Sequence, residues 1–379
     1  MRVSKRIFAL IIVVITGVHM AFSPCVALLS RADENTVHSY SVGEYNLIFD
    51  DAGVVPNSVR DRIGETFRTV YPIMAERYNK SAPKTVYLDI RTSGDGVAYA
   101  SGNRITLFAN WITDNPSDTD CITHELFHVV QSYPGYPEEH IWAIEGITDY
   151  ARYKFGLYND KQGWGLPNYN SGQNYTNSYG VAARFFVWLE QKKMADLVPK
   201  MDVILRRGDY TNESWVEVTG KTVDELWAEY AANPSVLPAS AVISDIHYTL
   251  PYKTVYNVWE TLDLSGLNVV KLMQDGTVWR VEDYTVSGYD PVPGDCRISV
   301  RYGDFVKRFF VQIADEPPRG DVNGDGRQNL QDIMKMRNFI LKAEQPTAKQ
   351  AYFADMNGDN LINAVDVLRL RDKILHVKK

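Results

Sequence analysis

The residues with the clearest potential for chemistry lie between positions 124 and 150. His124-Glu125-Leu126-Phe127-His128 places two histidines four residues apart, and Glu145-Gly146-Ile147-Thr148-Asp149-Tyr150 follows after sixteen residues. On a helix, side chains four residues apart project from one face, so both imidazoles can reach a single ion. A carboxylate from a second helix would complete three protein ligands and leave a fourth position open to water. This pattern is typical of a catalytic zinc site rather than a closed structural one.

The three carboxylates of these two motifs have different expected roles. Glu125 can point at a metal-activated water without being a ligand itself, and zinc lowers the pKa of such a water to about 7. Glu145 is the expected third ligand. Asp149, one helical turn further on, can accept a hydrogen bond from a ligand histidine and fix its tautomer. The alternative is that both are solvent-facing charges on an amphipathic helix, which is disfavoured by their apolar neighbours Trp142, Ile144, Ile147 and Tyr150.

Two helices must position these residues. Ser117 is the expected cap of a helix that runs to about Ser132, where Tyr133-Pro134-Gly135 stops it. Pro137 opens the next helix and Gly156 closes it, so the two helices form a hairpin. Upstream, the patterns predict strands at 45–49 and 85–90, a helix at 58–79, and a β-hairpin over 96–109 that turns at residues 101–103.

The same region resembles a known family. "HELFHVVQSYPGYPEEHIWAIEGITDYARYKFG", followed by "YGVAARFFVWLE" and "DELWAEY", is similar to the basic secretory protein family of metallopeptidases, within the gluzincin group. The resemblance spans about residues 40–232 and implies an α+β zincin-like peptidase domain, which we place at 36–232. It implies zinc on His124, His128 and Glu145, with Glu125 as general base and Asp149 behind the ligands. The family is best known from plants, whereas the rest of this chain looks bacterial, so the resemblance concerns this domain alone.

A gluzincin also needs a donor for the developing oxyanion. Tyr179, at the start of the helix that begins Tyr179-Gly180-Val181, is the candidate, and Tyr169, Tyr175 and His140 are its rivals. The strand at 104–108 either pairs with an extended peptide substrate or serves only as sheet structure; the sequence favours neither.

From about residue 240 the chain changes to short alternating strands separated by turn residues. "TLDLSGLNVVKLMQDGTVWRVEDYTVSGYDPVPGDCRISVRYG" resembles bacterial immunoglobulin-like modules over about residues 241–314. The resemblance implies a small all-β sandwich, and a connecting domain without chemistry is the favoured interpretation.

After Pro317-Pro318 an internal repeat begins, in which Asp321-Val322-Asn323-Gly324-Asp325-Gly326 recurs thirty-four residues later as Asp355-Met356-Asn357-Gly358-Asp359-Asn360. Each copy places acids or amides at loop positions 1, 3, 5, 9 and 12, where they can surround a hard cation, and the position 7 carbonyl adds one oxygen. In the first loop these are Asp321, Asn323, Asp325, Arg327, Asn329 and Asp332. In the second they are Asp355, Asn357, Asp359, Leu361, Asn363 and Asp366.

This duplicated pattern resembles an all-α type I dockerin, which we place at 319–379. The resemblance implies two calcium ions, folding that depends on them, and binding to a cohesin module of a cellulosome-type scaffold. Position 12 is Asp, not the Glu of a standard EF-hand. The differing pairs Leu330-Gln331 and Ala364-Val365, at positions that often carry partner specificity, do not identify the cohesin.

The N-terminus indicates secretion. Arg2, Lys5 and Arg6 precede an apolar stretch, and small residues near Ala27 suit cleavage, so residues 1–27 are the expected signal peptide. An uncleaved membrane anchor is the alternative. Cys25 does not make this a lipoprotein, because Phe22-Ser23-Pro24 is a poor lipidation context. After cleavage we expect no stable membrane association.

Composition sets the remaining limits. Hydrophobic residues at 45% and charged residues at 23% describe globular material. The net charge of −7 becomes about −10 without the signal peptide, and no basic run suggests nucleic acid as a partner. Only Cys121 and Cys296 follow the signal peptide, too few for a disulfide framework.

The sequence therefore predicts a secreted zinc metallopeptidase that cleaves peptides or proteins and binds one zinc and two calcium ions. Its dockerin is expected to hold it in an extracellular complex. The alternative is a catalytically silent binding or structural subunit that uses the zincin fold as a scaffold.

Overall fold

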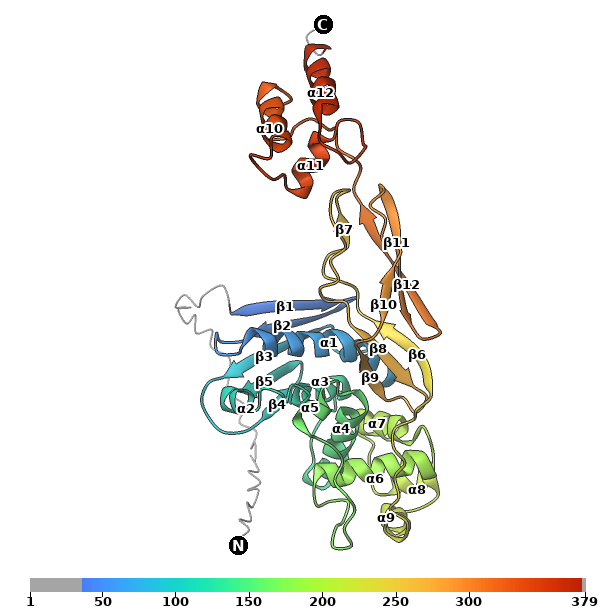
Figure 1. Ribbon diagram of the computed structural model, residues 1–379. Helices are drawn as coiled ribbons and strands as arrows, with labels where there is room; N and C mark the ends of the chain where they lie inside the picture. The colour runs from blue at the N-terminus through green and yellow to red at the C-terminus, as the bar shows by residue number, and fades with distance from the viewer. Residues whose placement is uncertain (1–35, 377–379) are drawn as a thin grey trace, which may run out of the picture. The chain divides into compact units, whose positions relative to one another are not determined.

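The computed structural model describes residues 36–376; the expected signal peptide and Cys25 lie outside these residues. The first part is a five-stranded sheet in the order β1-β2-β3-β5-β4 (Figure 1). Its strands are β1 (Val37–Val42), β2 (Tyr45–Asp50), β3 (Thr85–Arg91), β4 (Ala98–Ser101) and β5 (Arg104–Phe108). β2, β3 and β5 are parallel, whereas β1 and β4 run antiparallel to their neighbours at the two edges. The predicted strands and the 96–109 hairpin are confirmed.

Helices cover this sheet and build the rest of the α+β domain. α1 (Asn57–Tyr78), which the sequence predicted, contacts α3 and the strands β1 and β2. The pair that carries the candidate site is α3 (Cys121–Gln131) and α4 (Ile141–Phe155), joined by the 3-10 turn η1 (Glu138–His140) that follows Pro137. The other helices are α2 (Ala109–Asp114), α5 (Asn159–Gln162), α6 (Tyr179–Lys192), α7 (Leu197–Arg207), α8 (Glu213–Thr219) and α9 (Val223–Ala232).

The expected start of the first ligand helix at Ser117 is wrong. Residues 109–114 form the separate helix α2, and α3 begins only at Cys121, after Asp120. The Asp120 carboxylate accepts the backbone N–H groups of Leu157, at 3.1 Å, and of Tyr158. The start of α3 is therefore set by a contact with the segment after α4, which local sequence does not reveal.

Of the two alternatives for strand 104–108, pairing with a peptide substrate is wrong and sheet structure is confirmed. β5 lies between β3 and β4 and is hydrogen-bonded on both sides. The strand with a free edge on this side of the sheet is β4, which pairs only with β5 and contacts α3.

The middle region is β-rich. One sheet has the order β6-β8-β9 and the other β10-β11-β12-β7. Their strands are β6 (Ile243–Tyr248), β7 (Val255–Tyr256), β8 (Val269–Met273), β9 (Val278–Val281), β10 (Thr285–Ser287), β11 (Gly294–Tyr302) and β12 (Phe305–Ile313). Buried residues of both sheets, including Val269, Val281, Ile298 and Val311, share one apolar cluster. Cys296 is buried among them as a free thiol. The immunoglobulin-like assignment stays a prediction.

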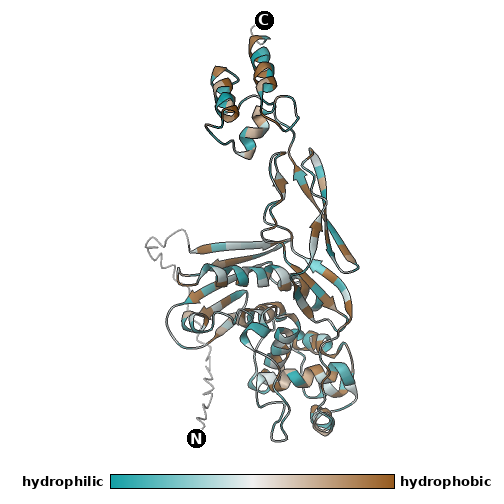
Figure 2. Ribbon diagram, in the orientation of Figure 1, coloured by the Kyte–Doolittle hydropathy of each residue, from teal (hydrophilic) through white to brown (hydrophobic). Residues whose placement is uncertain are grey.

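The C-terminal part contains three helices, α10 (Leu330–Ile340), α11 (Ala348–Ala354) and α12 (Ala364–His376). They pack around a small cluster that includes Val322, Met336 and Leu370. Hydrophobic and hydrophilic residues alternate along these helices (Figure 2). Across residues 36–376, no helix combines the length and the apolar character that a membrane crossing requires.

Candidate metal centre

The structure brings His124, His128 and Glu145 together. His124 Nε2 lies 3.2 Å from His128 Nε2 and 3.2 Å from Glu145 Oε2, and the third separation, from His128 Nε2 to Glu145 Oε2, is 3.4 Å. Tetrahedral zinc, with bonds of about 2.0–2.1 Å, holds its ligand atoms about 3.3–3.4 Å apart. Among residues 36–376, this is the one group of three or more His, Cys, Asp or Glu side chains whose ligand atoms gather closely enough for an ion. The donor set and its spacing fit zinc.

Each histidine is oriented from behind by an oxygen acceptor. His124 Nδ1 donates to Asp149 Oδ1 at 2.8 Å, the contact that the sequence predicted. His128 Nδ1 donates to Gln131 Oε1 at 2.8 Å, and Gln131 in turn donates to the carbonyl of Ile144 at 3.3 Å. With the proton of each ring held at Nδ1, the lone pair of each Nε2 faces Glu145, which is the tautomer that metal binding requires.

Gln131 was missed in the sequence. It is fully buried, and Thr148 Oγ1 on α4 lies 3.2 Å from the same Oε1 atom. Its spacing could have predicted the contact, because Gln131 follows His128 by three residues and side chains three residues apart on a helix are neighbours.

Glu125 has the environment of a proton acceptor. It is 6% exposed, and its Oε2 atom is buried without a hydrogen-bond partner. Burial raises the pKa of Glu125, and although the nearby imidazoles oppose this, the carboxylates of Glu145 and Asp149 add to it. A buried carboxylate oxygen without a partner is costly unless a further group meets it. Its place beside the two imidazoles fits a water molecule held at the same centre.

Interactions between the charged side chains shift the pKa values of Glu145 and His124 more than burial does. Burial alone would raise the pKa of Glu145, but the charges and hydrogen bonds of His128 and His124 outweigh it and hold that pKa well below its usual range. Burial alone would lower the pKa of His124, yet hydrogen bonds to Asp149 and Glu145 raise it well above its usual value. The carboxylates of Glu145 and Asp149 thus favour a positive charge at this centre.

Buried polar contacts fix the helix hairpin. Arg152 on α4 donates to Asp118 Oδ1, before α3, at 2.5 Å, and both side chains are over nine-tenths buried. Elsewhere on α4, Gly146 lets α6 approach: a Cβ there would lie 2.5 Å from the Cβ of Ala182 and 3.0 Å from the ring of Phe186. The helix α4, which carries Glu145, is thus packed against both α3 and α6.

Two half-exposed tyrosines flank the centre. Tyr179 begins α6 next to Gly180, where a Cβ would lie 4.0 Å from Asp149 Oδ2. Burial, followed by the charges of Glu145 and Asp149, raises the pKa of Tyr179 to about 12. Tyr136, in the loop between α3 and α4, lies with its hydroxyl 3.2 Å from His128 Nδ1, and the sequence did not single it out. The rivals of Tyr179 are engaged elsewhere. Tyr175 donates to Asp224 at 2.8 Å, Tyr169 packs on Tyr230, and His140 packs on Tyr210.

The two repeated loops have the same hydrogen-bond pattern, position by position. In the first, Asp321 accepts the backbone N–H groups of Gly324, Asp325 and Gly326, and the fully buried Asp332 accepts those of Val322, Asn323 and Asn329. In the second, Asp355 and Asp366 make the equivalent contacts. The position 3 and 5 side chains contact each other in both loops, through Asn323 and Asp325 and through Asn357 and Asp359.

The position 9 side chains have a different contact. Asn329 caps α10 by accepting the N–H of Gln331 at 2.7 Å, and Asn363 accepts that of Val365 at 2.8 Å. Both asparagines therefore fix the start of the helix that follows their loop. Arg327 and Leu361 follow the turn residues Gly326 and Asn360, both of which have positive φ, as expected for the sharp bend of each loop.

Comparison with solved structures finds distant similarity. The M1 zinc metallopeptidase from Deinococcus radiodurans is 12% identical with a TM-score of 0.34, over 53% of this chain and 51% of that protein. An aminopeptidase N family protein from Idiomarina loihiensis is 12% identical with a TM-score of 0.34, over 74% of this chain and 67% of that one. A functionally unknown conserved protein from Bacillus anthracis str. Ames is 9% identical with a TM-score of 0.29, over 72% and 70%. The chain spans about half the length of the first of these proteins.

Comparison with protein families is more informative, although no curated protein matches the chain. The model of the family described as peptidase of plants and bacteria (BSP) matches residues 29–230, and that of the dockerin type I domain matches residues 319–375. The first match covers more than half of the 379 residues. The chain therefore belongs to the BSP family of peptidases of plants and bacteria, and its residues 319–375 form a type I dockerin domain.

Proposed function

We propose that this chain is a secreted zinc-dependent endopeptidase that is attached through its dockerin to a cohesin-bearing extracellular complex. The observation that carries the proposal is the meeting of His124, His128 and Glu145 beside the partnerless oxygen of Glu125. These three side chains would hold one zinc ion, which would polarise a peptide carbonyl and activate a water molecule.

The chain's own residues would supply the proton transfers. Glu125 would accept a proton as the water oxygen bonds to the peptide carbon, and would pass it to the amine nitrogen as the C–N bond breaks. Burial raises the pKa of Glu125, so it holds that proton more readily than an exposed glutamate would. The half-exposed Tyr179 hydroxyl, which makes no hydrogen bond within residues 36–376, would donate to the developing oxyanion.

Substrate binding would use the free edge of β4. This edge strand contacts α3, the helix of the two histidines. An extended peptide that pairs with a strand edge is held by its backbone on both sides of the cleaved bond and needs no free terminus. This mode of binding favours cleavage within chains, and it makes peptides and proteins the proposed substrates.

The dockerin would bind two calcium ions in its two loops and dock onto a cohesin module. The duplicated pattern of hydrogen bonds supports two equivalent sites, one formed by Asp321 to Asp332 and the other by Asp355 to Asp366. An extracellular location agrees with such a complex and with the expected signal peptide at 1–27.

The test is Glu125→Gln in the full chain, with the exposed Glu138→Gln as its matched control. Hydrolysis of casein should fall by at least a thousandfold in the first variant and stay unchanged in the second, while elemental analysis finds one zinc and two calcium ions in both. Persistent cleavage by Glu125→Gln would refute the mechanism. A wild-type protein that binds zinc and cleaves nothing would favour the second candidate, a silent structural subunit.

A further inference from the structure

The hydrophobic core of the peptidase domain continues into the middle β region. Val270 on β8 and Val278 on β9 are buried in the same apolar cluster as the buried hydrophobic residues of α1, α3, α4 and α6. Leu272, also on β8, packs against this cluster. These residues lie beyond position 230, where the family match ends. Part of the middle region is therefore packed as a layer of the peptidase domain.

A buried lysine ties α4 to the turn between β8 and β9. Lys154 is 1% exposed, and its Nζ lies 2.8 Å from Glu190 Oε2 on α6 and donates to the carbonyl of Asp275 at 2.9 Å. A buried ammonium must be paired and hydrogen-bonded, because an uncompensated charge in the interior is very unfavourable. The β8–β9 turn therefore supplies part of the environment that Lys154 requires.

The next residue of this turn fits closely against α1. Gly276 has φ +80°, and a Cβ there would lie 2.0 Å from Arg77 Nη1. Arg77 lies 3.8 Å from Glu190, the same carboxylate that pairs with Lys154. The turn thus contacts a charged cluster shared by α1, α4 and α6.

Further contacts lie along the same boundary. Arg68 on α1 is 3% exposed and donates to the carbonyls of Gly266 at 2.8 Å and Leu250 at 2.6 Å. Arg280 on β9 pairs with Glu65 on α1 at 3.2 Å. Such a boundary, with a shared apolar core and buried charges, differs from the small polar contacts expected between a domain and a spacer.

We infer that β6, β8 and β9 belong to the peptidase unit, and that the turn at Asp275-Gly276 positions α4, the helix that carries Glu145 and Asp149. Lys154 follows Glu145 by nine residues, about 13 Å along the same helix. A rigid helix transmits a displacement of one end to the other, so the turn acts on the metal centre through α4. Lys154 and Gly276 are positioning residues in this scheme. The zinc part of the inference rests on the proposed function, whereas the packing part does not.

The test compares two glycine variants of the full chain. Gly276→Ala introduces a Cβ against Arg77, while Gly303→Ala, in the β11–β12 turn, also has positive φ (+55°) but no atom within 4 Å of the new Cβ. At a temperature where both are folded, Gly276→Ala should bind zinc about tenfold more weakly in chelator competition, and the backbone amides of α4 should exchange faster. Gly303→Ala should stay within twofold of the wild type. Excess zinc should restore kcat without changing KM.

A second pair tests the lysine. Lys154→Met keeps the aliphatic length without the charge, and Lys161→Met, an exposed lysine on α5, is its control. Lys154→Met should weaken zinc binding and speed α4 exchange, whereas Lys161→Met should do neither. If Gly276→Ala fails to fold while Gly303→Ala folds, the peptidase depends on the turn even more strongly than inferred.

The result that overturns the inference is a Gly276→Ala protein in which only residues 243–313 exchange faster, with α4 and zinc affinity unchanged. That outcome would make the middle region an independent module. If the wild type binds no zinc, the proposed function fails, but exchange in α4 still decides whether the turn anchors the helix.

Discussion

The two histidines of the proposed zinc site are oriented by acceptors of different charge, and this difference predicts unequal effects of removing them. His124 donates to the carboxylate of Asp149, and His128 donates to the neutral amide of Gln131, both at 2.8 Å. Asp149→Ala removes a charged acceptor, Asp149→Asn keeps an oxygen without the charge, and Gln131→Met removes a neutral acceptor at similar side-chain length. All three variants leave His124, His128 and Glu145 in place.

The expected magnitudes follow from the kind of hydrogen bond lost. A hydrogen bond to a charged group contributes about 1.5–3 kcal/mol and a neutral one about 0.5–1.5 kcal/mol, and each 1.4 kcal/mol is a factor of ten. Asp149→Ala should therefore weaken zinc binding about 10–100-fold, the range known for residues behind metal ligands. Gln131→Met should weaken it about 3–10-fold, with Asp149→Asn between the two.

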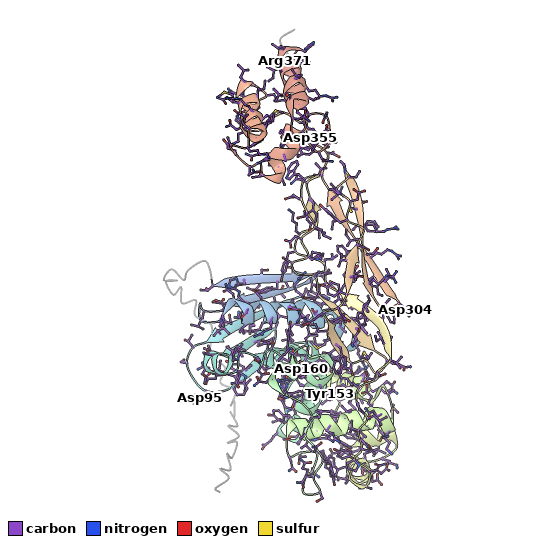
Figure 3. All side chains as sticks on the ribbon, in the orientation of Figure 1. Asp95, Tyr153, Asp160, Asp304, Asp355 and Arg371 are labelled. Carbon is purple, nitrogen blue, oxygen red and sulfur yellow. The ribbon has the colours of Figure 1, made fainter. Side chains whose placement is uncertain are left out.

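The assay is chelator competition for zinc at pH 7.5, with activity on casein measured at saturating zinc. The control is Asp160→Ala, which removes the same charge from an exposed side chain on α5 (labelled in Figure 3) and should change nothing. Zinc affinity within twofold of the wild type for Asp149→Ala would refute the reasoning. So would a larger loss in Gln131→Met than in Asp149→Ala, since the neutral acceptor would then matter more than the charged one.

Four other outcomes can be measured. Tyr179→Phe should lower kcat about 100–1,000-fold at unchanged KM in steady-state assays, as expected for loss of an oxyanion donor. Arg152→Met leaves Asp118 buried without its cationic partner, and should reduce the unfolding free energy by about 3–5 kcal/mol in urea titrations. Asp332→Ala removes an acceptor of three backbone N–H groups and should reduce bound calcium from two ions to one by calorimetry, with casein cleavage unchanged. Neighbouring carboxylates raise the pKa of His124, so protons compete with zinc to a higher pH than for a free imidazole, and zinc affinity should still be rising above pH 6.5 in titrations of the metal-free protein.

Much of the candidate site could be predicted from sequence, because its geometry is set by local periodicity. His124 and His128 are one helical turn apart, and so are Glu145 and Asp149, so each pair shares a helix face wherever the helices lie. A short connection between two helices makes them antiparallel neighbours, which brings the two faces together. These relations depend on residues close in sequence, which is why the structure has the same pairs in contact.

The parts that sequence did not predict depend on distant contacts. α3 begins at Cys121 rather than near Ser117 because the side chain before it, Asp120, is bound to the backbone of Leu157 and Tyr158. β5 lies inside the sheet because of the order of the strands. The alternation of residues within a single strand does not reveal that order. The short strand β9 buries Val278 in the peptidase core, and the exposed neighbours Trp279 and Arg280 do not predict this contact.

The charges of the site explain why both orienting contacts are needed. Glu125, Glu145 and Asp149 place three carboxylates around two imidazoles in a largely buried space, so without a cation the imidazoles attract protons. Burial alone would lower the pKa of His128, but the charge and hydrogen bond of Glu145 outweigh it and raise that pKa. Protonated imidazoles cannot bind metal. Asp149 and Gln131 each hold one ring with its Nδ1–H occupied, so the proton lost when zinc binds is the one on Nε2, which faces Glu145. The acceptors thus do more than fix ring orientation, because they decide which nitrogen of each imidazole gives up its proton. Glu125, whose Oε2 has no hydrogen-bond partner, is then the carboxylate that is free to take up the proton of a water molecule.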